Sequence, residues 1–523
     1  MFVSLAIAHT WPLASAPAHW SRTDAGDGAL NIWAVGWVGH TLFQHPTRVF
    51  EANIFYPEHL TLAYSEAMLL QGAIAAPILA LGGSAVLAYN LLVLGGLALT
   101  GWLFCLLIQR WTSSWSAGYI GGSLAAFNAF SLVQLTHLQF LHVEFFAVML
   151  FAVDRLVASR QWRSAIMLAA AFALQALTSI YVLVFSIWTL TFAVLARVGD
   201  WRRDTASALI KLATAGAIAM LVLSPYLWPY VKVHESMGFA RGVDEAEAAN
   251  WANYLSTTAR VHFSAWSHSF APEATSSTFP GVLATALLIL ACCDRANTRD
   301  PRFRMCAIVA VGCAAVSFAP ALPFYRLLHA AIPLFQTVRV LPHIGLVVLL
   351  MIAVLAGFGV ASIQRSWKAR HWWPVAVLLF VGVNVEAARA PIGYVWFDRV
   401  PAVYDALAAE PNAVVAELPF PMPQQWFLNT PYMVNSTRHW RPLLNGYSGF
   451  RPGSYAASYD LLRKFPSDEA LIGLIAKGVT HIVVHQRAMN QGAADDRYNP
   501  FESVESLQLV ARDDDVLIYR LRR

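Results

Sequence analysis

Apolar runs separated by polar segments of varied length fill the first 390 residues of the chain. A helix needs about 20 mainly apolar residues to cross a bilayer. The runs predict spans near residues 1–10, 86–107, 117–135, 140–157, 165–177, 180–196, 212–228, 282–291, 305–319, 344–360 and 374–385. We therefore predict an α-helical polytopic membrane protein with about eleven spans.

The pattern changes after residue 385, where shorter apolar stretches alternate with polar turns. These stretches predict helices at 402–410 and 467–477 and strands at 413–418, 480–485, 507–511 and 516–521. Strands that bury modest apolar faces beside helices are typical of a small α/β domain. We predict a membrane domain at 1–390 and an α/β domain at 391–523.

Basic residues gather in four short segments between the apolar runs, at 155–163, 197–211, 295–304 and 365–370. Short loops rich in Lys and Arg usually face the cytoplasm. If these segments are cytoplasmic and successive spans cross in opposite directions, the loops at 14–66, 232–280 and 322–342 are external. The α/β domain is then extracytoplasmic. This count treats the apolar piece at 68–81 as a re-entrant or interfacial helix, because it is short for a span and contains Pro77. If it crosses the membrane, loop 14–66 is cytoplasmic instead.

Composition narrows the function classes. The chain is 57% hydrophobic and only 13% charged, compared with about 25% charged in soluble domains. Its formal net charge of +5 is spread over short clusters, so nucleic acid is not an expected partner. The five cysteines lie in or beside apolar runs, without zinc-ligand spacing. We expect no disulfides, no structural metal and no cofactor, although a catalytic divalent metal is left open. The first residues carry no basic segment typical of a cleavable signal.

The stretch 24–66 is unusually polar for its surroundings. Asp24 and Asp27 stand at its start beside Gly26 and Gly28, which favour a sharp turn. From Leu30 the apolar residues recur at helical spacing, which predicts an interfacial helix with its tryptophans at headgroup depth. A carboxylate at the mouth of a membrane cavity can act as a general base, and Asp27 is our first candidate, with Asp24 as its competitor. The alternative is that either aspartate merely caps the helix.

A second polar cluster contains His137, Gln139, His142 and Glu144. Gln139 and His142 are three residues apart and could share one helical face. Glu144 enters an apolar run, where an unpaired charge is costly and a buried acid is a functional candidate. The alternative is that Glu144 pairs with a nearby histidine only to join helices.

Four basic residues of the predicted external loops form a third candidate set: Lys232, Arg241, Arg260 and Arg339. Together they could hold a phosphate or pyrophosphate. Arg339 is the sharper candidate because its segment leads directly into a span. Arg241 has several acids nearby in sequence, so surface ion pairs are its alternative role.

Aromatic residues are dense between 426 and 459, in a segment that also contains Arg438, Arg441 and Arg451. Such rings could stack on sugars, and the alternative is that they form core. No phosphate-binding glycine loop, zinc-protease helix or nucleophile elbow occurs.

Several short motifs together resemble the GT-C superfamily of membrane glycosyltransferases, in layout their bacterial YfhO-like and dolichyl-phosphate-mannose mannosyltransferase-like branches. The motifs lie at Gly26–Trp33, Asn53–Pro57, Leu62–Glu66, Ala88–Leu91, His137–Gln139, Val415–Pro419 and Asn445–Tyr447. This resemblance covers nearly the whole chain, although the first span is shorter than the family pattern.

The resemblance implies a function. Such enzymes transfer a sugar from a polyprenyl-phosphate carrier to a lipid, glycan or protein acceptor on the outer face of the cytoplasmic (inner) membrane. The resemblance assigns the base to Asp27, a further acid to Glu144, and the lipid-phosphate site to Arg241 or Arg339. Two rival hypotheses remain: a transporter or flippase of lipid-linked sugars, and a non-catalytic scaffold for envelope assembly.

Overall fold

The computed structural model describes residues 1–21, 26–239, 242–272, 275–321, 323–331, 336, 338–367, 369–489, 501 and 504–522. The chain divides into two compact units. The bundle unit contains Met1–Ser15, Leu91–Leu227 and Ala240–Gly393, and the sheet unit contains Ala16–Asn90, Trp228–Phe239 and Tyr394–Arg523. The composition change near residue 390 thus lies close to one boundary between the units, but the sheet unit also includes the polar stretch near the amino terminus.

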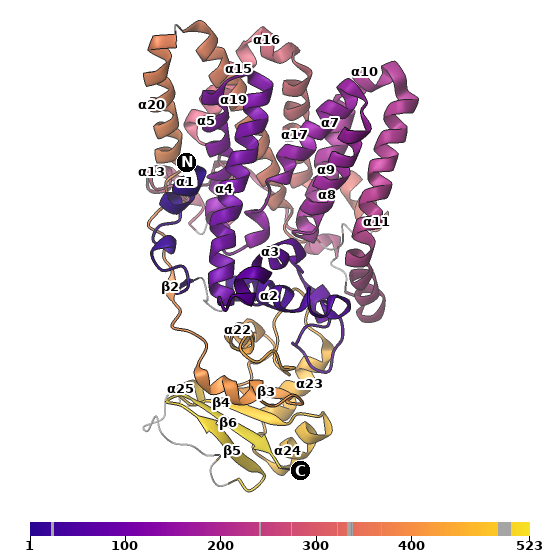
Figure 1. The fold of residues 1–523 in the computed structure, drawn as a ribbon, viewed down its shortest axis with the longest axis vertical. Helices are drawn as coiled ribbons and strands as arrows, with labels where there is room; N and C mark the ends of the chain where they lie inside the picture. Colours follow the sequence, from indigo (N-terminus) through magenta and orange to yellow (C-terminus); the bar gives the residue numbers. More distant parts are fainter. Residues whose placement is uncertain are drawn as a thin grey trace. The chain divides into compact units, whose positions relative to one another are not determined.

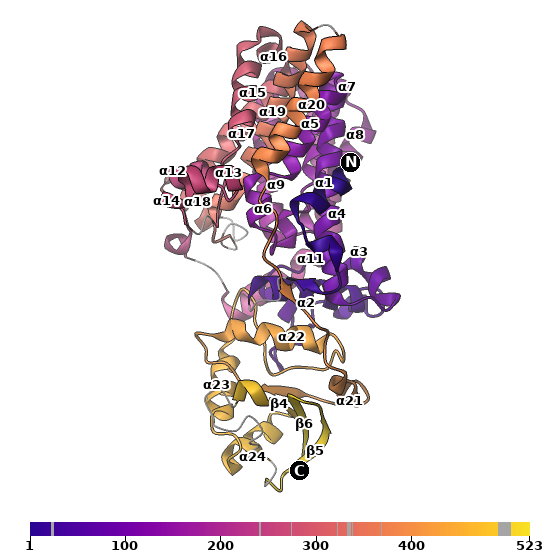
Figure 2. The same ribbon diagram turned by 90° about the vertical axis from the view of Figure 1, so that its left-hand side faces the viewer.

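The bundle unit is helical, and its long helices run side by side in both ribbon views (Figures 1 and 2). Its helices are α1 (Phe2–His9), most of α4 (Ala85–Thr112), α5 (Trp115–Ala126), α6 (Ala129–Val133), α7 (Phe145–Ser159), α8 (Trp162–Ala176), α9 (Ile180–Ala196), α10 (Val198–Trp201), most of α11 (Thr205–Met237), α12 (Trp251–Leu255), α13 (Arg260–His262), α14 (His268–Phe270), α15 (Val282–Cys293), α16 (Arg295–Arg299), α17 (Pro301–Ser317), α18 (Pro323–Ala331), α19 (Gly345–Ser366) and α20 (Ala369–Ala387). The expectation of a mainly helical chain with several apolar helices is confirmed.

Helix α19 forms the centre of the bundle unit, because most of its residues are buried. It packs on α5, α15 and α17. Glycines permit these close contacts: a Cβ on Gly359 would collide with the carbonyl oxygen of Leu287 in α15, and one on Gly121 in α5 would lie 3.0 Å from the carbonyl oxygen of Ala353. Small residues at helix crossings let backbones approach closely, as is common in membrane bundles.

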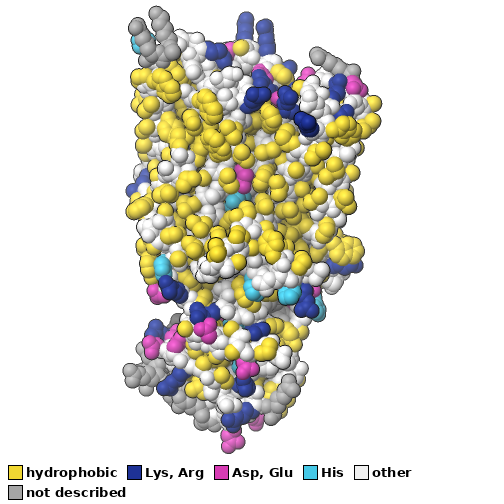
Figure 3. Space-filling model, in the orientation of Figure 1, with side chains coloured by type: hydrophobic (Ala, Val, Ile, Leu, Met, Phe, Trp, Pro, Cys, Tyr) yellow, Lys and Arg dark blue, Asp and Glu magenta, His cyan; other side chains and the backbone are white. Residues whose placement is uncertain are grey.

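Three helical segments in the described residues are long and apolar enough to cross a membrane: Ala85–Thr112, Thr205–Met237 and Leu341–Ser366. The apolar helices Ile180–Ala196, Val282–Cys293 and His371–Ala387 are shorter. Figure 3 shows hydrophobic side chains covering the flank of the bundle unit between its ends. A surface of this kind is expected where lipid, and not water, is the neighbour. The number of spans, predicted as about eleven, stays a prediction.

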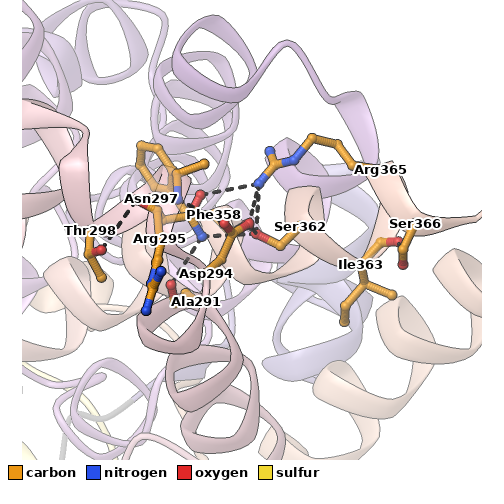
Figure 4. A network of polar contacts seen from close by, with 11 residues as sticks. Ala291, Asp294, Arg295, Asn297, Thr298, Phe358, Ser362, Ile363, Arg365 and Ser366 are labelled. Atoms are coloured by element: carbon orange, nitrogen blue, oxygen red, sulfur yellow. Dashed lines mark hydrogen bonds and ion pairs between the residues drawn. The ribbon is translucent and has the colours of Figure 1, made fainter.

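Lys and Arg side chains gather at the end of the bundle unit where α10 and α16 lie (Figure 3). At this end, Asp294 accepts hydrogen bonds from the Ser362 hydroxyl at 2.7 Å and from the Arg365 guanidinium at 2.6 Å (Figure 4). Asn297 donates to the same hydroxyl at 2.9 Å. This network ties the turn between α15 and α16 to the carboxyl end of α19, so the basic segments at 295–304 and 365–370 share one end of the bundle.

The sheet unit combines helices, short strands and long connections. Its elements are β1 (Trp20–Ser21), α2 (Asp27–Thr41), α3 (Leu69–Ala80), β2 (Val395–Trp396), α21 (Asp405–Ala408), β3 (Val415–Leu418), α22 (Thr430–Ser436), α23 (Gly453–Leu462), α24 (Asp468–Ala476), β4 (His481–His485), α25 (Gln486–Met489), β5 (Leu507–Arg512) and β6 (Val516–Leu521). Strands β1 and β2 pair with each other, whereas the other four form one mixed sheet in the order β3-β4-β6-β5.

In the mixed sheet, β3 and β4 are parallel and β4, β6 and β5 are antiparallel. Nearly all side chains of β3, β4 and β6 are buried, whereas β5 is an edge strand with most of its side chains exposed. All four strands lie where the apolar stretches predicted them, so the small carboxyl-terminal α/β domain is confirmed as a mixed sheet with helices. Its predicted extracytoplasmic position stays a prediction.

Candidate active site

Asp27 lies at the start of α2, in the first helical turn, and is solvent-exposed. Gly26 precedes it with a φ of 134°, a conformation that residues with a side chain rarely adopt. The amide of Gly26 donates a 3.0 Å hydrogen bond to the hydroxyl of Thr430 in α22. The Gly26 turn and the Thr430 contact therefore fix the point at which α2 begins, and a carboxylate there is favoured by the helix dipole.

Helix α2 is held on several sides within the sheet unit. It packs on α3 and α22. Gly39 of α2 faces Gly72 of α3, where an added Cβ on Gly72 would collide with Val38. Such tight packing leaves α2 little freedom to shift, so the position of Asp27 is set by a rigid element.

The residues that follow α2 reinforce this position. Trp33 donates from its indole nitrogen to the side chain of Asn53 at 3.0 Å, and Asn53 donates to the Ser436 hydroxyl at 3.1 Å. Backbone hydrogen bonds run between the motif at 53–57 and the segment before Tyr447: Phe55 donates to Asn445 and Tyr56 donates to Leu443. Two of the motifs that carry the family resemblance therefore bind each other.

Tyr447 brings a hydroxyl to Asp27. Its phenol donates to Asp27 Oδ1 at 3.1 Å, and its ring meets the edge of Trp426 with ring centroids 4.9 Å apart. The Arg451 guanidinium lies 6.0 Å above the centre of the Trp426 ring. One part of the sheet unit thus brings together the exposed Asp27 carboxylate, a half-buried phenol and a half-buried indole.

Two alternatives from the sequence can be compared with this geometry. Gly26 occupies the N-cap position of α2, and no side-chain cap is present there, so Asp27 is not the capping residue. Asp24 lies outside the described residues. The headgroup depth of the tryptophans stays a prediction, while Trp33 is 1% and Trp37 8% exposed, because α2 is covered by protein on most of its surface.

Glu144 is buried in the bundle unit, at 2% exposure, immediately before α7. Its Oε1 lies 3.1 Å from His142 Nδ1. The other ring nitrogen, Nε2, lies 3.1 Å from the carbonyl oxygen of Leu92 in α4, and Gln175 of α8 donates to the His142 carbonyl at 2.7 Å. The predicted pairing of Glu144 with a histidine is therefore present, and it connects α4, α7 and α8.

The hydrogen-bond partners fix one proton of the pair formed by His142 and Glu144. A carbonyl oxygen only accepts, so His142 Nε2 carries a proton. Nδ1 then either donates to an ionised Glu144 or accepts from a protonated one. Both arrangements share one proton between the two side chains. Glu144 Oε2 is buried and has no hydrogen-bond partner in the described part of the chain.

Gln139 and His137 complete this region. Gln139 lies in the short 3-10 helix Leu138–Phe140 and is 5% exposed, with its Oε1 unpaired among the described residues. His137 is the residue before that helix, and its Nδ1 lies 3.0 Å from the Thr136 hydroxyl. Gln139 and His142 were expected to share a helical face, but the 3-10 helix ends before His142.

The basic candidates have separate environments. Arg339 is half-exposed and lies 3.6 Å from Glu247, while its backbone amide donates to the Tyr181 hydroxyl at 2.9 Å. Arg260, at the start of α13, donates to the carbonyl of Arg389. Lys232 belongs to the sheet unit and pairs with Glu235 at 2.9 Å. Arg241 lies outside the described residues.

A second buried pair was missed from the sequence. Glu386, at the end of α20, lies 2.8 Å from His262 Nε2 and accepts backbone hydrogen bonds from Val282 and Leu283 at the start of α15. The pair borders a cavity of about 30 Å³, room for one or two water molecules. An acid at the end of an apolar run is the signal that could have revealed it. Because the carboxylate satisfies free amides at a helix start, it accounts for the position of α15.

Across the described ranges, no cluster of three or more His, Cys, Asp or Glu side chains is placed to hold a metal ion.

Comparison with known proteins gives a likeness of fold. No family model matches the sequence, and no curated protein matches it. The structure is similar to that of arabinofuranosyltransferase AftD from mycobacteria, with a TM-score of 0.56 and 13% identity over 100% of this chain. The match covers 39% of AftD, so the chain spans about two fifths of that protein's length.

Two further solved structures match along more of their own length. ArnT from Cupriavidus metallidurans in the apo state has a TM-score of 0.50 and 13% identity, with coverage of 99% of this chain and 96% of ArnT. The oligosaccharyltransferase from Archaeoglobus fulgidus, tethered to an acceptor peptide, has a TM-score of 0.50 and 11% identity, with coverage of 93% and 68%.

These likenesses confirm the expected architecture: the chain has a fold similar to GT-C membrane glycosyltransferases, at low sequence identity. With its apolar helices, the likeness indicates a multi-pass membrane protein.

Proposed function

We propose that this chain is a GT-C type glycosyltransferase that moves a sugar from a polyprenyl-phosphate carrier to an acceptor at the outer face of the cytoplasmic membrane. Asp27 is the general base in this proposal. Structural likeness at this identity concerns the fold alone, and function resides in sites. The proposal therefore rests mainly on one observation, the exposed Asp27 carboxylate beside the Tyr447 phenol at the start of a rigid helix.

The geometry suits proton abstraction. A general base must be accessible to its substrate and must be held in position. Asp27 meets both requirements, because its side chain is exposed while α2 is packed on α3 and α22. The Tyr447 hydroxyl donates to Oδ1 of this carboxylate at 3.1 Å and so orients it.

In the proposed reaction, Asp27 takes the proton of the acceptor hydroxyl while the oxygen of that hydroxyl attacks the anomeric carbon of the donor sugar. A new carbon–oxygen bond forms as the bond from that carbon to the lipid phosphate breaks. The electron pair of the broken bond leaves with the phosphate, and the anomeric configuration inverts. A single displacement with a good leaving group requires mainly positioning from the protein.

Two features of the bundle unit support a lipid-linked donor. Arg339 is bound through its backbone to Tyr181, in the first turn of α9. Further along α9, Leu183, Ile187 and Leu190 line a groove of about 330 Å³ between α8, α9 and α11, and every lining residue is apolar or glycine. A phosphate near Arg339 and an isoprenoid chain in this groove would both lie along α9, which is how we assign the carrier.

Sugar transfer in isolated membranes tests the proposal. We would supply a polyprenyl-phosphate-linked sugar to membranes that contain the wild-type chain, Asp27→Asn or the matched control Asp460→Asn, an exposed aspartate of α23 that pairs with Arg463 on the surface. We expect Asp27→Asn to lower the rate of transfer by at least about 10²-fold at unchanged protein abundance and the control to retain it. Full transfer by Asp27→Asn would contradict the proposal.

The same experiment separates the rival functions. A transporter or flippase of lipid-linked sugars would keep moving its lipid after Asp27→Asn, because no proton transfer is involved. A scaffold would lose its function on deletion of 391–523 and not through Asp27.

A further inference from the structure

The sheet unit contains a large open cavity that the proposed reaction does not use. Its volume is about 900 Å³. One wall comes from the carboxyl end of α2 and the loop that follows it, and the other comes from the segment 438–441, with Ala408 at its edge. The lining residues are Trp37, His40, Thr41, His45, Arg48, Glu51, His59, Ala408, Arg438, His439, Trp440 and Arg441.

The lining is cationic. It contains three arginines and four histidines but a single carboxylate, Glu51. That carboxylate is already engaged, since it lies 3.1 Å from His59 Nδ1 and accepts the amide of Leu60 at 3.2 Å. Arginine guanidinium groups are preferred ligands of phosphates and carboxylates in proteins, so the cavity favours an anion.

The three arginines differ in how far their charge is compensated. Arg438 forms two hydrogen bonds of 2.7 Å with Asp405. Arg441 donates only to backbone carbonyls, among them that of Ala408 at 2.6 Å, so it is held rigidly without an acid partner in the described residues. The Arg48 side chain is exposed and has no hydrogen-bond or ion-pair partner in the part of the chain that the structure describes. Two arginines therefore keep an uncompensated charge.

His439 adds a buried donor without an acceptor. Its Nδ1 accepts the amide of Arg441 at 2.9 Å, so the proton of the neutral ring is on Nε2. Burial, with the nearby Arg441 charge, lowers the pKa of His439 to about 3, and the ring is neutral at ordinary pH. The side chain is 4% exposed, and Nε2 has no hydrogen-bond partner among the described residues. Buried polar groups are nearly always satisfied in folded proteins, and Nε2 is a donor that the described residues leave unmatched.

An aromatic flank adjoins these cations. Trp440 stacks on His40 with ring centroids 4.6 Å apart, and its ring meets Trp37 at 5.9 Å. Aromatic rings supply a rigid, largely apolar contact surface. A ligand that fills the cavity would present an oxyanion to the arginines and a ring face to this flank.

We propose that this cavity binds an anionic carbohydrate, a sugar that carries a phosphate or carboxylate group. The site is distinct from Asp27. Helix α2 has 15 residues, with Asp27 first and Thr41 last, which places the cavity roughly 20 Å from the carboxylate at 1.5 Å per residue. In the proposed transferase, the cavity holds a remote anionic part of the acceptor glycan, and this role, unlike the binding, rests on the proposed function.

Binding to the purified full-length chain in detergent tests the proposal. The probes are a hexose phosphate, a hexuronate, the neutral hexose and inorganic phosphate, titrated in a calorimeter. We expect the hexose phosphate or the hexuronate to bind at least about tenfold more tightly than the neutral hexose and inorganic phosphate, because charge-assisted and ring contacts add. The better of these two probes identifies the anionic group. Equal binding of the neutral hexose, or of inorganic phosphate alone, would overturn the proposal.

Matched variants place the binding in this cavity. Arg48→Gln removes an exposed charge without a structural partner, so we expect about tenfold weaker binding with unchanged thermal stability. The control is Arg463→Gln, another exposed arginine of the sheet unit, in a surface pair with Asp460, and it should bind as the wild type does. Undiminished binding by Arg48→Gln would count against the cavity. Asp27→Asn should bind normally, so a failed transferase assay with intact binding would leave this site standing.

Discussion

Asp27 and Glu144 are the two acids on which the sequence places most weight, and their surroundings are opposite. Asp27 is exposed, lies at a helix start and meets a phenol. Glu144 is 2% exposed and meets a histidine that is itself bound to a backbone carbonyl. One carboxylate is open to a substrate, whereas the other is enclosed by three helices.

This difference separates two roles that look alike in a sequence. A base must reach its substrate, so accessibility favours Asp27. A buried acid needs a partner, because an unpaired charge away from water is costly. His142 supplies that partner for Glu144 and joins α4, α7 and α8 in doing so. We therefore expect the two acids to respond differently to substitution, in activity and in stability.

The largest expected effect is on catalysis. Asp27→Asn should lower the rate of sugar transfer by about 10²–10⁴-fold, the usual contribution of a general base. Glu144→Gln keeps a hydrogen-bonding group opposite His142 and should retain transfer within about tenfold. Initial rates in membranes of matched protein content measure both. Equal losses in the two variants would break the distinction between the two acids.

Substitution of Glu144 should lower the stability of the protein more than substitution of Asp27. Glu144→Ala leaves His142 buried without its partner and should destabilise the bundle unit by about 3–5 kcal/mol, as for a broken buried pair. Asp27→Ala removes an exposed charge from a helix start, and we expect a loss of about 0.3–1 kcal/mol. Unfolding of the purified variants in detergent provides the measurement. A larger loss for Asp27→Ala would show that its role is structural.

A smaller effect should distinguish the phenol from the carboxylate. Tyr447→Phe removes one hydrogen bond to Asp27 and keeps the ring contact with Trp426. We expect transfer to fall by about tenfold, since a hydrogen bond to a charged group contributes about 1.5–3 kcal/mol and the new gap admits water. The pH profile of the rate is the informative readout, because a lost donor should move the acidic limb. An unchanged rate and profile would remove Tyr447 from the site.

The smallest expected effect is a loss of stability on acidification, caused by the buried side chain of His439 in the sheet unit. Burial and Arg441 lower the pKa of His439 from 6.5 to about 3, so between these values the unfolded chain binds more protons than the folded one. Stability is then fully present above pH 6.5 and falls as the pH drops toward 3. At pH 5.5 we expect a loss of about 1 kcal/mol. The measurement is unfolding of the wild type and His439→Asn as a function of pH, and the variant should show a flatter dependence.

Much of the architecture follows from local patterns. Apolar length identified the helices that became α4, α9 and α19, and alternating short stretches identified all four strands of the mixed sheet. These features depend on neighbouring residues, which is why they can be read from the chain. The same reasoning predicted no partner for the motif at Asn53–Pro57. Its backbone hydrogen bonds go to Leu443 and Asn445, which lie almost 400 positions away in the chain.

The sequence by itself determined that the chain has a helical membrane-type domain and a small α/β domain, and it drew attention to Asp27 and Glu144. Only the tertiary structure decided which acid is exposed, that Glu386 meets His262, and that Arg48, His439 and Arg441 line one cavity. Hydrophobic periodicity shows which side of a helix or strand avoids water. The exposure of a side chain and the residues that it contacts depend on which distant segment packs against that element, and no local pattern shows this.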